Sequence, residues 1–465
     1  MKGKNRIQRY LDDYALRGPW EVIPKPEGGV GAVVVIPALA ESRYLFETLA
    51  ALAENDPAEL RRALVICVIN NRGPGGAAPK DIEDNRITLA VLRSLESRSL
   101  PGELPQWVSS THLERILDGS LRLASIDASS PGYEMPAGTG GVGMARKIGF
   151  DRALTVFDHD VPGVKLLFSL DADTLVERGY LSSVRTFFEE TGSSAAVIAF
   201  AHRQGSTMRE REAICAYETF LRYYVLGLHF AGSPYAYHSI GSTMAFTVDR
   251  YAAVRGMNRR QAGEDFYYLN KMAKTGTIGK IISTRVHPSS RPSRRVPFGT
   301  GRKVAGFLGE DADYLVYDPR CFSVLKDLIT AIPRVAESPG AAQETLATLH
   351  PLLEGFLVQN HFDEAWRNIR RNGRSRAVLT RHFHTWFDGF RTFKFIRYLS
   401  AQGLHSVDMF DAAGELLAMM RRGTPAAVKG AIMPSFDERF ALLDHLRLLE
   451  DELNAPAGVP KAVAG

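Results

Sequence analysis

The chain has 465 residues, of which 45% are hydrophobic and 23% are charged. This length exceeds one ordinary hydrophobic core, so we expect two domains or one large domain with an extension. The composition excludes a small disulfide-rich fold and a largely disordered chain. The 57 lysines and arginines exceed the 52 aspartates and glutamates by a net charge of +5, which is too small to indicate a nucleic-acid-binding protein.

The cysteines and the N-terminal residues bear on the cellular compartment. Cys67, Cys215 and Cys321 are widely separated and form no C-x-x-C pair, which predicts neither a disulfide framework nor a structural zinc site. The N-terminal residues lack the apolar centre of a signal peptide, and no stretch approaches the roughly 20 apolar residues that span a bilayer. We therefore expect a cytoplasmic protein without a transmembrane segment. Peripheral contact with a membrane and a homo-oligomeric state stay open.

The first part of the chain has an α/β pattern. Residues 1–30 are expected to form an N-terminal helical segment. Over residues 31–305, aliphatic runs alternate with segments of helical period, which predicts a mostly parallel sheet flanked by helices. The predicted strands are Ala32–Pro37, Ala63–Ile69, Leu121–Asp127, Lys165–Leu170 and Ala195–His202. The predicted helices are Glu41–Asn55, Gly143–Phe157 and Tyr180–Thr191.

Strand signals fade in the last third of the chain. Over residues 306–454, apolar residues recur at helical spacing, so we expect a helical C-terminal region. The clearest apolar set is Phe383, Trp386, Phe387, Phe390, Phe393 and Ile396. Residues 455–465 are small or turn-forming for the most part and are expected to be a disordered tail.

Residues suited to ligand binding follow the predicted strands. Pro37, Asn70, Asp127 and Asp171 each lie at or just past the carboxyl end of a strand. In open α/β sheets that edge is where ligands bind. Asp171 and Asp173 enclose one small residue, and a turn past the strand can direct both carboxylates to one point, where hard oxygen ligands suit Mg²⁺ or Mn²⁺. By itself, an Asp-x-Asp pair is more often a turn with capping or backbone hydrogen bonds than a metal site.

Five segments, in order, are similar to those of glycosyltransferase family 2, which has the GT-A fold. They are AVVVIPALAES, LVICVINNRG, GTGGVGMARKIGFDRA, the Asp-x-Asp segment LLFSLDADTLVERGY, and the stretch from GSTMAF to the GED motif at Gly263–Asp265. The resemblance covers about the first 300 residues. It implies a GT-A-type, Rossmann-like domain that uses Mn²⁺ or Mg²⁺ to transfer a sugar from a nucleotide-diphosphate donor to a hydroxyl of a small-molecule or lipid-linked acceptor.

The resemblance also implies roles for individual residues. Asp265 would be the general base of an inverting reaction, assisted by Glu264. The residues implied at the nucleotide are Pro37, Ala38, Leu39, Glu41, Asn70, Asn71, Arg146 and Asp171. The implied metal ligands are Asp171, Asp173 and His287. The residues implied at the diphosphate or the acceptor are Arg291, Arg294, Arg295, Gly241 and Ser242.

Two segments depart from a simple motif match. Asn70 or Asn71 stands where the family usually has an aspartate at the base, so uracil is not secured as the donor base. The residues from Gly138 to Gly143 fit G-x-G-x-x-G, but Ala128–Ala137 separates them from the preceding strand. A dinucleotide motif opens its helix directly after the strand, so we interpret these residues as a mobile glycine loop instead.

Other functions remain as alternatives. FSLDADTLVERG is also similar to the first motif of haloacid-dehalogenase-type, Mg²⁺-dependent phosphatases, with Asp171 as the nucleophile and Asp311 and Asp313 as a distal motif. Three strand-and-turn units precede Asp171, whereas such a nucleophile usually lies near the start of its domain. A retaining glycosyltransferase acting on glycerate or phosphoglycerate is a second alternative, and a catalytically inactive nucleotide-sugar-binding protein is a third.

Overall fold

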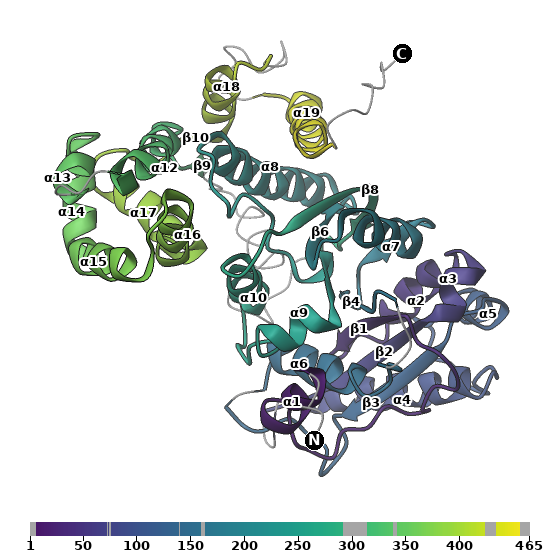
Figure 1. Ribbon diagram of the computed structural model, residues 1–465. Coiled ribbons are helices and arrows are strands. Elements are labelled where there is room, and N and C mark those ends of the chain that lie inside the picture. The colour runs from purple at the N-terminus through teal and green to yellow at the C-terminus, as the bar shows by residue number, and fades with distance from the viewer. Residues whose placement is uncertain are drawn as a thin grey trace, which may run out of the picture. The chain divides into compact units, whose positions relative to one another are not determined.

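The computed structural model describes residues 6–71, 73, 76–138, 140–159, 163–291, 314–337, 342–423 and 434–455. The chain divides into two compact units. Figure 1 labels helices and strands of both. Unit 1 consists of Met1–Gln204, Ser239–Met272 and Gly276–Arg302. Unit 2 consists of Gly205–His238, Ala273–Thr275 and Lys303–Gly465.

Unit 1 contains a mixed sheet with the order β3-β2-β1-β4-β7-β6-β8-β5 among the described residues. Its strands are β1 (Ala32–Ala38), β2 (Ala63–Asn70), β3 (Leu123–Ala128), β4 (Leu166–Ser169), β5 (Leu175–Val176), β6 (Ala195–Phe200), β7 (Met244–Thr247) and β8 (Gly279–His287). Nearly every residue of β1 and β2 is buried, as expected for strands covered on both faces. All five predicted strands are present, with ends shifted by up to two residues.

The parallel half of the sheet contains a topological switch point. β1 pairs in parallel with β2 on one side and with β4 on the other, and β2 pairs in parallel with β3. The chain therefore moves outward from β1 to β3 and then returns to the far side of β1. The carboxyl ends of β1 and β4 lie next to each other at this switch, where open α/β sheets bind ligands.

The other half of the sheet includes antiparallel pairs. β7 pairs antiparallel with both β4 and β6, and β5 pairs antiparallel with the end of β8. β6 and β8 are parallel, but their register shifts: Ile198 pairs with Ile281, whereas Ala199 pairs with Arg285. The three residues Ile282–Thr284 are thus extra on β8, which is the geometry of a bulge.

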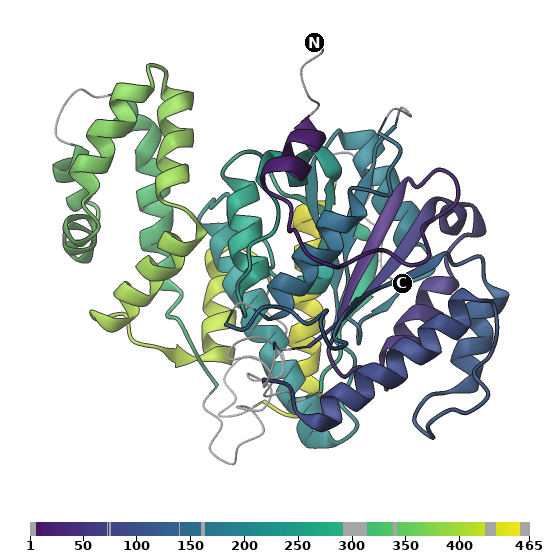
Figure 2. The ribbon, with the colours of Figure 1, turned by 90° about the horizontal axis from the view of Figure 1, so that it is seen from below.

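Helices pack against this sheet (Figure 2). The helices of unit 1 are α1 (Arg6–Asp13), α2 (Leu45–Ala53), α3 (Pro57–Arg62), α4 (Pro79–Glu96), α5 (Ser110–Asp118), α6 (Val142–Ala153), α7 (Tyr180–Thr191), the 3-10 helix η1 (Gly241–Thr243), α9 (Val248–Ala253) and α10 (Glu264–Ala273). α6 packs on β1 and β2, α4 packs on β2 and β3, and α7 packs on β8. The predicted α/β class, with a mostly parallel sheet flanked by helices, is confirmed.

The N-terminal helix is attached to α6 by a buried polar network. Tyr10 donates to Asp151 Oδ1 at 2.6 Å, and Lys147 Nζ donates to the Tyr10 hydroxyl at 2.7 Å. Tyr251 donates to the same Asp151 oxygen at 2.7 Å, and the backbone N–H of Leu16 donates to Oδ2 at 2.8 Å. Burial lowers the pKa of Lys147, although the Asp151 carboxylate opposes that shift. The network fixes α6, the helix that carries Arg146.

Unit 2 is helical among its described residues. Its elements are α8 (Met208–Phe230), β9 (Leu315–Val316), α12 (Arg320–Glu337), α13 (Ala342–Ala347), α14 (Pro351–Gln359), α15 (Phe362–Asn372), α16 (Arg376–Trp386), α17 (Gly389–Ala401), β10 (Val407–Asp408), α18 (Met409–Met419) and α19 (Phe436–Asn454). Phe383 and Phe387 are buried in its core and stack at 5.4 Å between ring centroids. Arg447 of α19 donates to Glu218 of α8 at 2.7 Å, joining these helices. The predicted helical C-terminal region is confirmed.

No helix in the described ranges combines the length and the apolar character needed to cross a membrane.

Candidate functional site

The loop after β1 is held in place by α4. The backbone N–H of Ala40 donates to Asn85 Oδ1 at 2.9 Å. Ser42 donates to Asp84 from its backbone at 3.0 Å and from its hydroxyl at 2.6 Å. Ala40 has a φ of 51°, a left-handed conformation that costs a non-glycine residue about 1 kcal/mol. This turn delays the helix predicted from Glu41, so α2 begins only at Leu45.

The same asparagine fixes the end of β2. Asn85 Nδ2 donates to the backbone oxygen of Asn70 at 3.0 Å and to Asn71 Oδ1 at 2.7 Å. Asn71 Nδ2 in turn donates to the backbone oxygen of Ser129 at 2.9 Å. The two predicted base-binding asparagines therefore lie at the carboxyl edge of the sheet. Both the oxygen and the nitrogen of the Asn71 side-chain amide are hydrogen-bonded within the protein.

Asp127 closes the turn after β3. Its Oδ1 accepts hydrogen bonds from the backbone N–H groups of Ser129 and Ser130, each at 2.9 Å. Burial raises the pKa of Asp127, but the hydrogen bonds from Ser130 and Ser129 outweigh it and hold the pKa below its usual value. This carboxylate stays ionised and stabilises the turn.

A buried guanidinium joins the two acidic motifs. Arg146 of α6 is 2% exposed and donates to both Asp171, just past β4, and Glu264, the first residue of α10. Its charge also acts on Asp265. Three segments separated by up to 118 residues thus converge on one cation.

These carboxyl groups titrate unusually. Burial raises the pKa of Glu264 to about 7, with Arg146 opposing the shift and Asp265 adding to it. Burial also raises the pKa of Asp265, again opposed by Arg146. The pKa of Asp171 is raised by burial and by the charge of Asp173, against the effect of Arg146. Carboxyl groups with raised pKa values in one cluster are typical of proton-transfer sites, although buried ion pairs with a structural role shift in the same way.

Two glycines allow this close packing. A Cβ on Gly241 of η1 would collide with the Arg146 guanidinium, so only glycine admits the arginine here. A Cβ on Gly143 would lie 2.9 Å from Glu264 Cβ, so the start of α6 packs directly on the start of α10. Next to Gly241, Ser242 is fully buried and its hydroxyl has no hydrogen-bond partner within the described part of the chain.

A second arginine joins Asp173 to the loop after β1. Arg291 Nε donates to Asp173 Oδ2 at 2.8 Å, and its terminal nitrogen donates to both carboxylate oxygens of Glu41 at 2.6 and 2.7 Å. The guanidinium also lies 4.2 Å from the centroid of the Tyr44 ring. Glu41 and Arg291 are 250 residues apart in sequence.

His287 ends β8, next to β5. Its Nδ1 lies 3.1 Å from the backbone oxygen of Ala201, and its Nε2 lies 3.5 Å from Glu177 Oε1. Backbone hydrogen bonding at Nδ1 is the usual way in which a metal-binding histidine is oriented, because it leaves Nε2 as the ligand nitrogen.

The carboxylates at the site suit a divalent cation in part. No group of three His, Cys, Asp or Glu side chains arranged around a common point is found among the described residues. Asp171 and Asp173 are nonetheless adjacent, partly exposed and hard ligands. One or two carboxylates, completed by phosphate oxygens and water, are the usual protein share of a Mg²⁺ site at a nucleotide. The pair fits such an ion if Arg146 and Arg291 release the carboxylate oxygens of Asp171 and Asp173 that they now bind.

The remaining predicted residues lie at the end of β1 or outside the described residues. Pro37 and Ala38 end β1 and are buried, and Leu39 follows them in the loop. Arg294, Arg295, Asp311 and Asp313 lie outside the described residues, as does Thr139 in the glycine-rich segment.

Sequence reasoning missed Asn85 and Asp84. A signal for Asn85 exists: it occupies the same stripe of α4 as Leu89 and Leu92, at the spacing of a buried helix face. An asparagine in such a stripe needs hydrogen-bond partners, and here they are the ends of β1 and β2.

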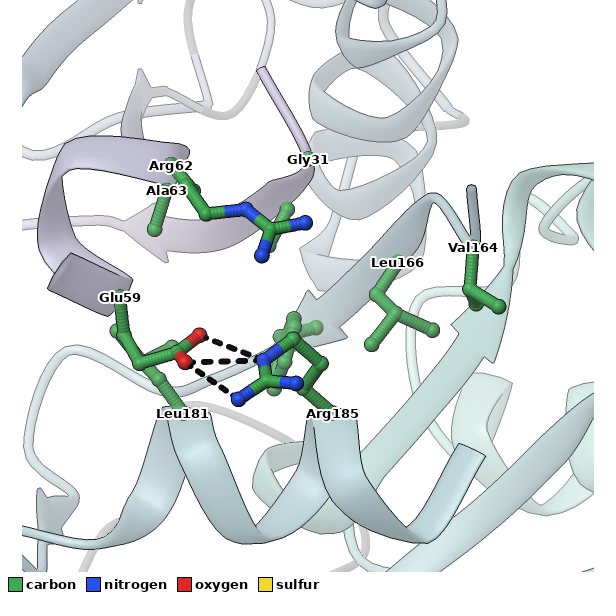
Figure 3. Close-up of a pocket in the computed structure, with 10 residues that line it drawn as sticks. Gly31, Glu59, Arg62, Ala63, Val164, Leu166, Leu181 and Arg185 are labelled. Atoms are coloured by element: carbon green, nitrogen blue, oxygen red, sulfur yellow. Dashed lines mark hydrogen bonds and ion pairs between the residues drawn. The ribbon is translucent and has the colours of Figure 1, made fainter. Parts of the chain in front are cut away.

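A small recess lies at the opposite edge of the sheet (Figure 3). It is lined by the starts of β1, β2 and β4 and by the ion pair between Arg185 and Glu59 at 2.7 Å. Because it faces the amino ends of these strands, it is separate from the cluster around Asp171.

The fold and these contacts define an α/β protein with a charged candidate site at the carboxyl edge of its sheet. No family model matches the chain, and a search of curated proteins finds no match.

Solved structures show a distant likeness. Residues 1–349 of S. aureus TarS are 11% identical over 91% of each chain, with a TM-score of 0.35. The same protein with UDP-GlcNAc is 13% identical, with a TM-score of 0.35 and coverage of 91% of each chain. The mannosyltransferase PcManGT from Pyrobaculum calidifontis, with GDP-Man and Mn²⁺, is 14% identical over 96% of this chain and 92% of its own, with a TM-score of 0.36. TM-scores this low carry no argument, so the function rests on the chain's own residues.

Proposed function

We propose that the protein is a metal-dependent glycosyltransferase that moves a sugar from a nucleotide-diphosphate donor to an acceptor hydroxyl with inversion. One observation carries the proposal: Arg146 joins Asp171 of the Asp-x-Asp pair to Glu264 of the Glu-Asp pair, next to the switch point of the sheet. Two acidic motifs that the sequence separates by some ninety residues thus belong to one cluster, as the resemblance to glycosyltransferase family 2 requires.

The donor is proposed to lie across the ends of β1, β2 and β4. Pro37, Ala38 and Leu39 would face the nucleoside, and Asn70 would hydrogen-bond the base, with Asn71 shaping that wall. Bidentate guanidinium groups are the preferred protein partners of phosphate, so Arg291 would bind the diphosphate once it leaves Asp173.

The chemical step is assigned to Asp265. Its carboxylate would accept the proton of the acceptor hydroxyl while the acceptor oxygen forms a bond to the anomeric carbon and the bond to the diphosphate oxygen breaks. The burial that raises the pKa of Asp265 improves it as a proton acceptor. Glu264 would hold Arg146, and Arg146 would keep Asp171 in place.

The proposed ion site consists of Asp171 and Asp173, completed by phosphate oxygens of the donor and by water. His287, the third ligand that the sequence predicts, forms no group of three with them among the described residues and would have to approach when the ion binds. A bound Mn²⁺ or Mg²⁺ would neutralise charge that develops on the departing nucleoside diphosphate. We also propose a cytoplasmic location, because Cys67, Cys215 and Cys321 are free and buried.

A thermal-shift panel of nucleoside diphosphates and nucleotide sugars, with and without Mn²⁺, tests the proposal. At a ligand concentration of about 100 Kd, binding stabilises the folded state by about 2.7 kcal/mol, which is readily measured. We expect stabilisation by one base only, dependent on Mn²⁺ and lost in Asp173→Ala. The exposed Asp118 provides a matched control, because Asp118→Ala should keep the response.

Turnover then separates the remaining functions. Release of nucleoside diphosphate from the stabilising donor supports the transferase. Release of phosphate from a generic phosphomonoester, abolished in Asp171→Asn, would instead establish the phosphatase. Binding without turnover in the presence of any acceptor would indicate a nucleotide-sugar-binding protein.

A further inference from the structure

Arg291 pairs with Asp173, one of the two carboxylates of the proposed ion site. It is 25% exposed and contacts Asp173, Glu41 and the face of Tyr44 at the same time. The two carboxylates raise its pKa well above the usual range, against the effect of burial, so the group carries a full positive charge.

Acidic side chains outnumber basic ones around Arg291 among the residues that the structure describes. This cluster consists of the carboxyl groups of Glu41, Asp171, Asp173, Glu264 and Asp265 and the guanidinium groups of Arg146 and Arg291. Within the described ranges, five acidic side chains lie around two arginines, and Glu264, with a pKa raised to about 7, is only partly ionised near neutral pH. Such a cluster attracts further positive charge, and a divalent cation would supply it.

The two arginines differ in how easily they can move. Arg146 is 2% exposed, and its guanidinium is enclosed by Gly241. Arg291 is more exposed and has a second carboxylate, Glu41, that it can keep while it leaves Asp173. Of the two Asp-x-Asp carboxylates, Asp173 is therefore the one that can exchange its partner.

We propose that Arg291 is a placeholder for the divalent cation at Asp173. In the ligand-free protein its guanidinium neutralises Asp173. When the cation arrives, the Nε–H bond to Asp173 is given up and Arg291 remains on Glu41, from where it can pair with a phosphate of the donor. This inference rests on the proposed function, and it adds that cation and donor bind cooperatively because each favours the same position of Arg291.

Mn²⁺ binding to the nucleotide-free protein tests the inference, measured by the loss of the free-ion signal in electron paramagnetic resonance. A competing charge-assisted hydrogen bond lowers the apparent affinity by about tenfold or more, so Arg291→Gln should bind Mn²⁺ about tenfold more tightly than the wild type. The gain should vanish when Asp173→Asn is added. The matched control is Arg203→Gln, which removes a bidentate pair with Glu47 at 2.9 Å in the same unit and should leave Mn²⁺ affinity unchanged.

The alternative outcomes are distinct. In one outcome, Arg291→Gln folds, as judged by its unfolding transition, and yet binds Mn²⁺ no more tightly than the wild type. In that case the ion pairs of Arg291 are purely structural and the inference is wrong. Should that variant not fold, Arg291→Lys serves instead, because an ammonium group reaches one carboxylate at a time and should give a smaller gain; no gain overturns the inference.

The proposed function fails separately. If the wild type shows Mn²⁺-dependent stabilisation by a nucleotide sugar while no Arg291 variant gains Mn²⁺ affinity, the function stands and the placeholder role falls. If the wild type and Arg291→Gln bind neither Mn²⁺ nor any nucleotide sugar, both are overturned.

Discussion

Asn85 donates a hydrogen bond to the side-chain oxygen of Asn71 at 2.7 Å. Through this contact and those to Ala40 and Asn70, one buried amide on α4 sets the position of the chain just past both β1 and β2. The nucleoside end of the proposed site therefore depends on a residue that is only 2% exposed. A side chain so placed acts on a ligand through the backbone that it positions.

Replacing this amide should weaken the protein and its donor binding together. Asn85→Ala removes the partner of two buried oxygens, on Asn70 and Asn71, and of the part-buried N–H of Ala40. At about 1 to 3 kcal/mol per buried group, this predicts a loss of at least about 2 kcal/mol in the free energy of unfolding. Urea unfolding measures it, and donor affinity is read by thermal shift. The exposed Asn372, which makes one hydrogen bond to its own helix, is the control: Asn372→Ala should cost under about 0.5 kcal/mol. Equal losses in both variants would contradict the role of Asn85.

Asp265→Asn should separate binding from chemistry. The amide keeps the shape of the carboxylate but cannot take up the acceptor proton, so we expect donor affinity to be nearly intact and transfer to fall by about 100-fold or more. Steady-state transfer with the donor identified by thermal shift measures the effect. A loss of under roughly tenfold would argue against Asp265 as the general base and would favour Glu264 in that role.

Glu264 should make stability depend on pH. Burial raises its folded-state pKa to about 7, so the folded chain holds this proton more tightly than the unfolded chain does. The stability that the protonated Glu264 contributes to the folded state is fully present below the ordinary carboxyl pKa of about 4.5. This stability is lost as the pH rises through about 7. Glu264→Gln mimics the protonated form. From pH 5 to pH 8 the wild type should therefore lose about 1 to 3 kcal/mol of unfolding free energy relative to this variant. Urea unfolding at both pH values checks the sign; a relative gain by the wild type would refute it.

Tyr10→Phe should loosen the attachment of the N-terminal helix to α6. The variant removes a donor to Asp151 and an acceptor for Lys147, both buried, and should cost about 1 to 3 kcal/mol. Denaturant unfolding measures this loss. Tyr14, which follows the same helix and is 39% exposed, offers the comparison, since Tyr14→Phe should change stability by less than about 0.5 kcal/mol. A similar cost for both would show that the network contributes nothing specific.

Much of the fold follows from local pattern in the sequence. The aliphatic runs predict the five strands closely, and α7 is found at the predicted Tyr180–Thr191. β7 and β5 could not be predicted in this way, because four and two residues are too few to show a period. The start of α2 was predicted four residues early, since the left-handed turn at Ala40 is fixed by a partner on α4 rather than by its own sequence.

The candidate site was predictable only as a set of positions. Strand ends pointed to Asn70 and Asp171, but nothing local indicates that Asp171 shares Arg146 with Glu264. Such pairings join distant segments, and their geometry depends on packing, here on the glycines at 143 and 241. The roles proposed for Asp265 and His287 stay predictions.

The register shift between β6 and β8 makes chain length itself a determinant of this site. Ile282–Thr284 act as a spacer between two parts of β8 that both pair with β6, and the second part leads to His287. Arg285 and Val286 are paired to β6, so deleting one spacer residue would either tighten the bulge or draw Arg285–His287 back by about 3.3 Å. In the second case these strand residues would turn to the opposite face, because neighbouring strand residues alternate. The length of this spacer, and not only the identity of the side chains, therefore sets where the end of β8 lies.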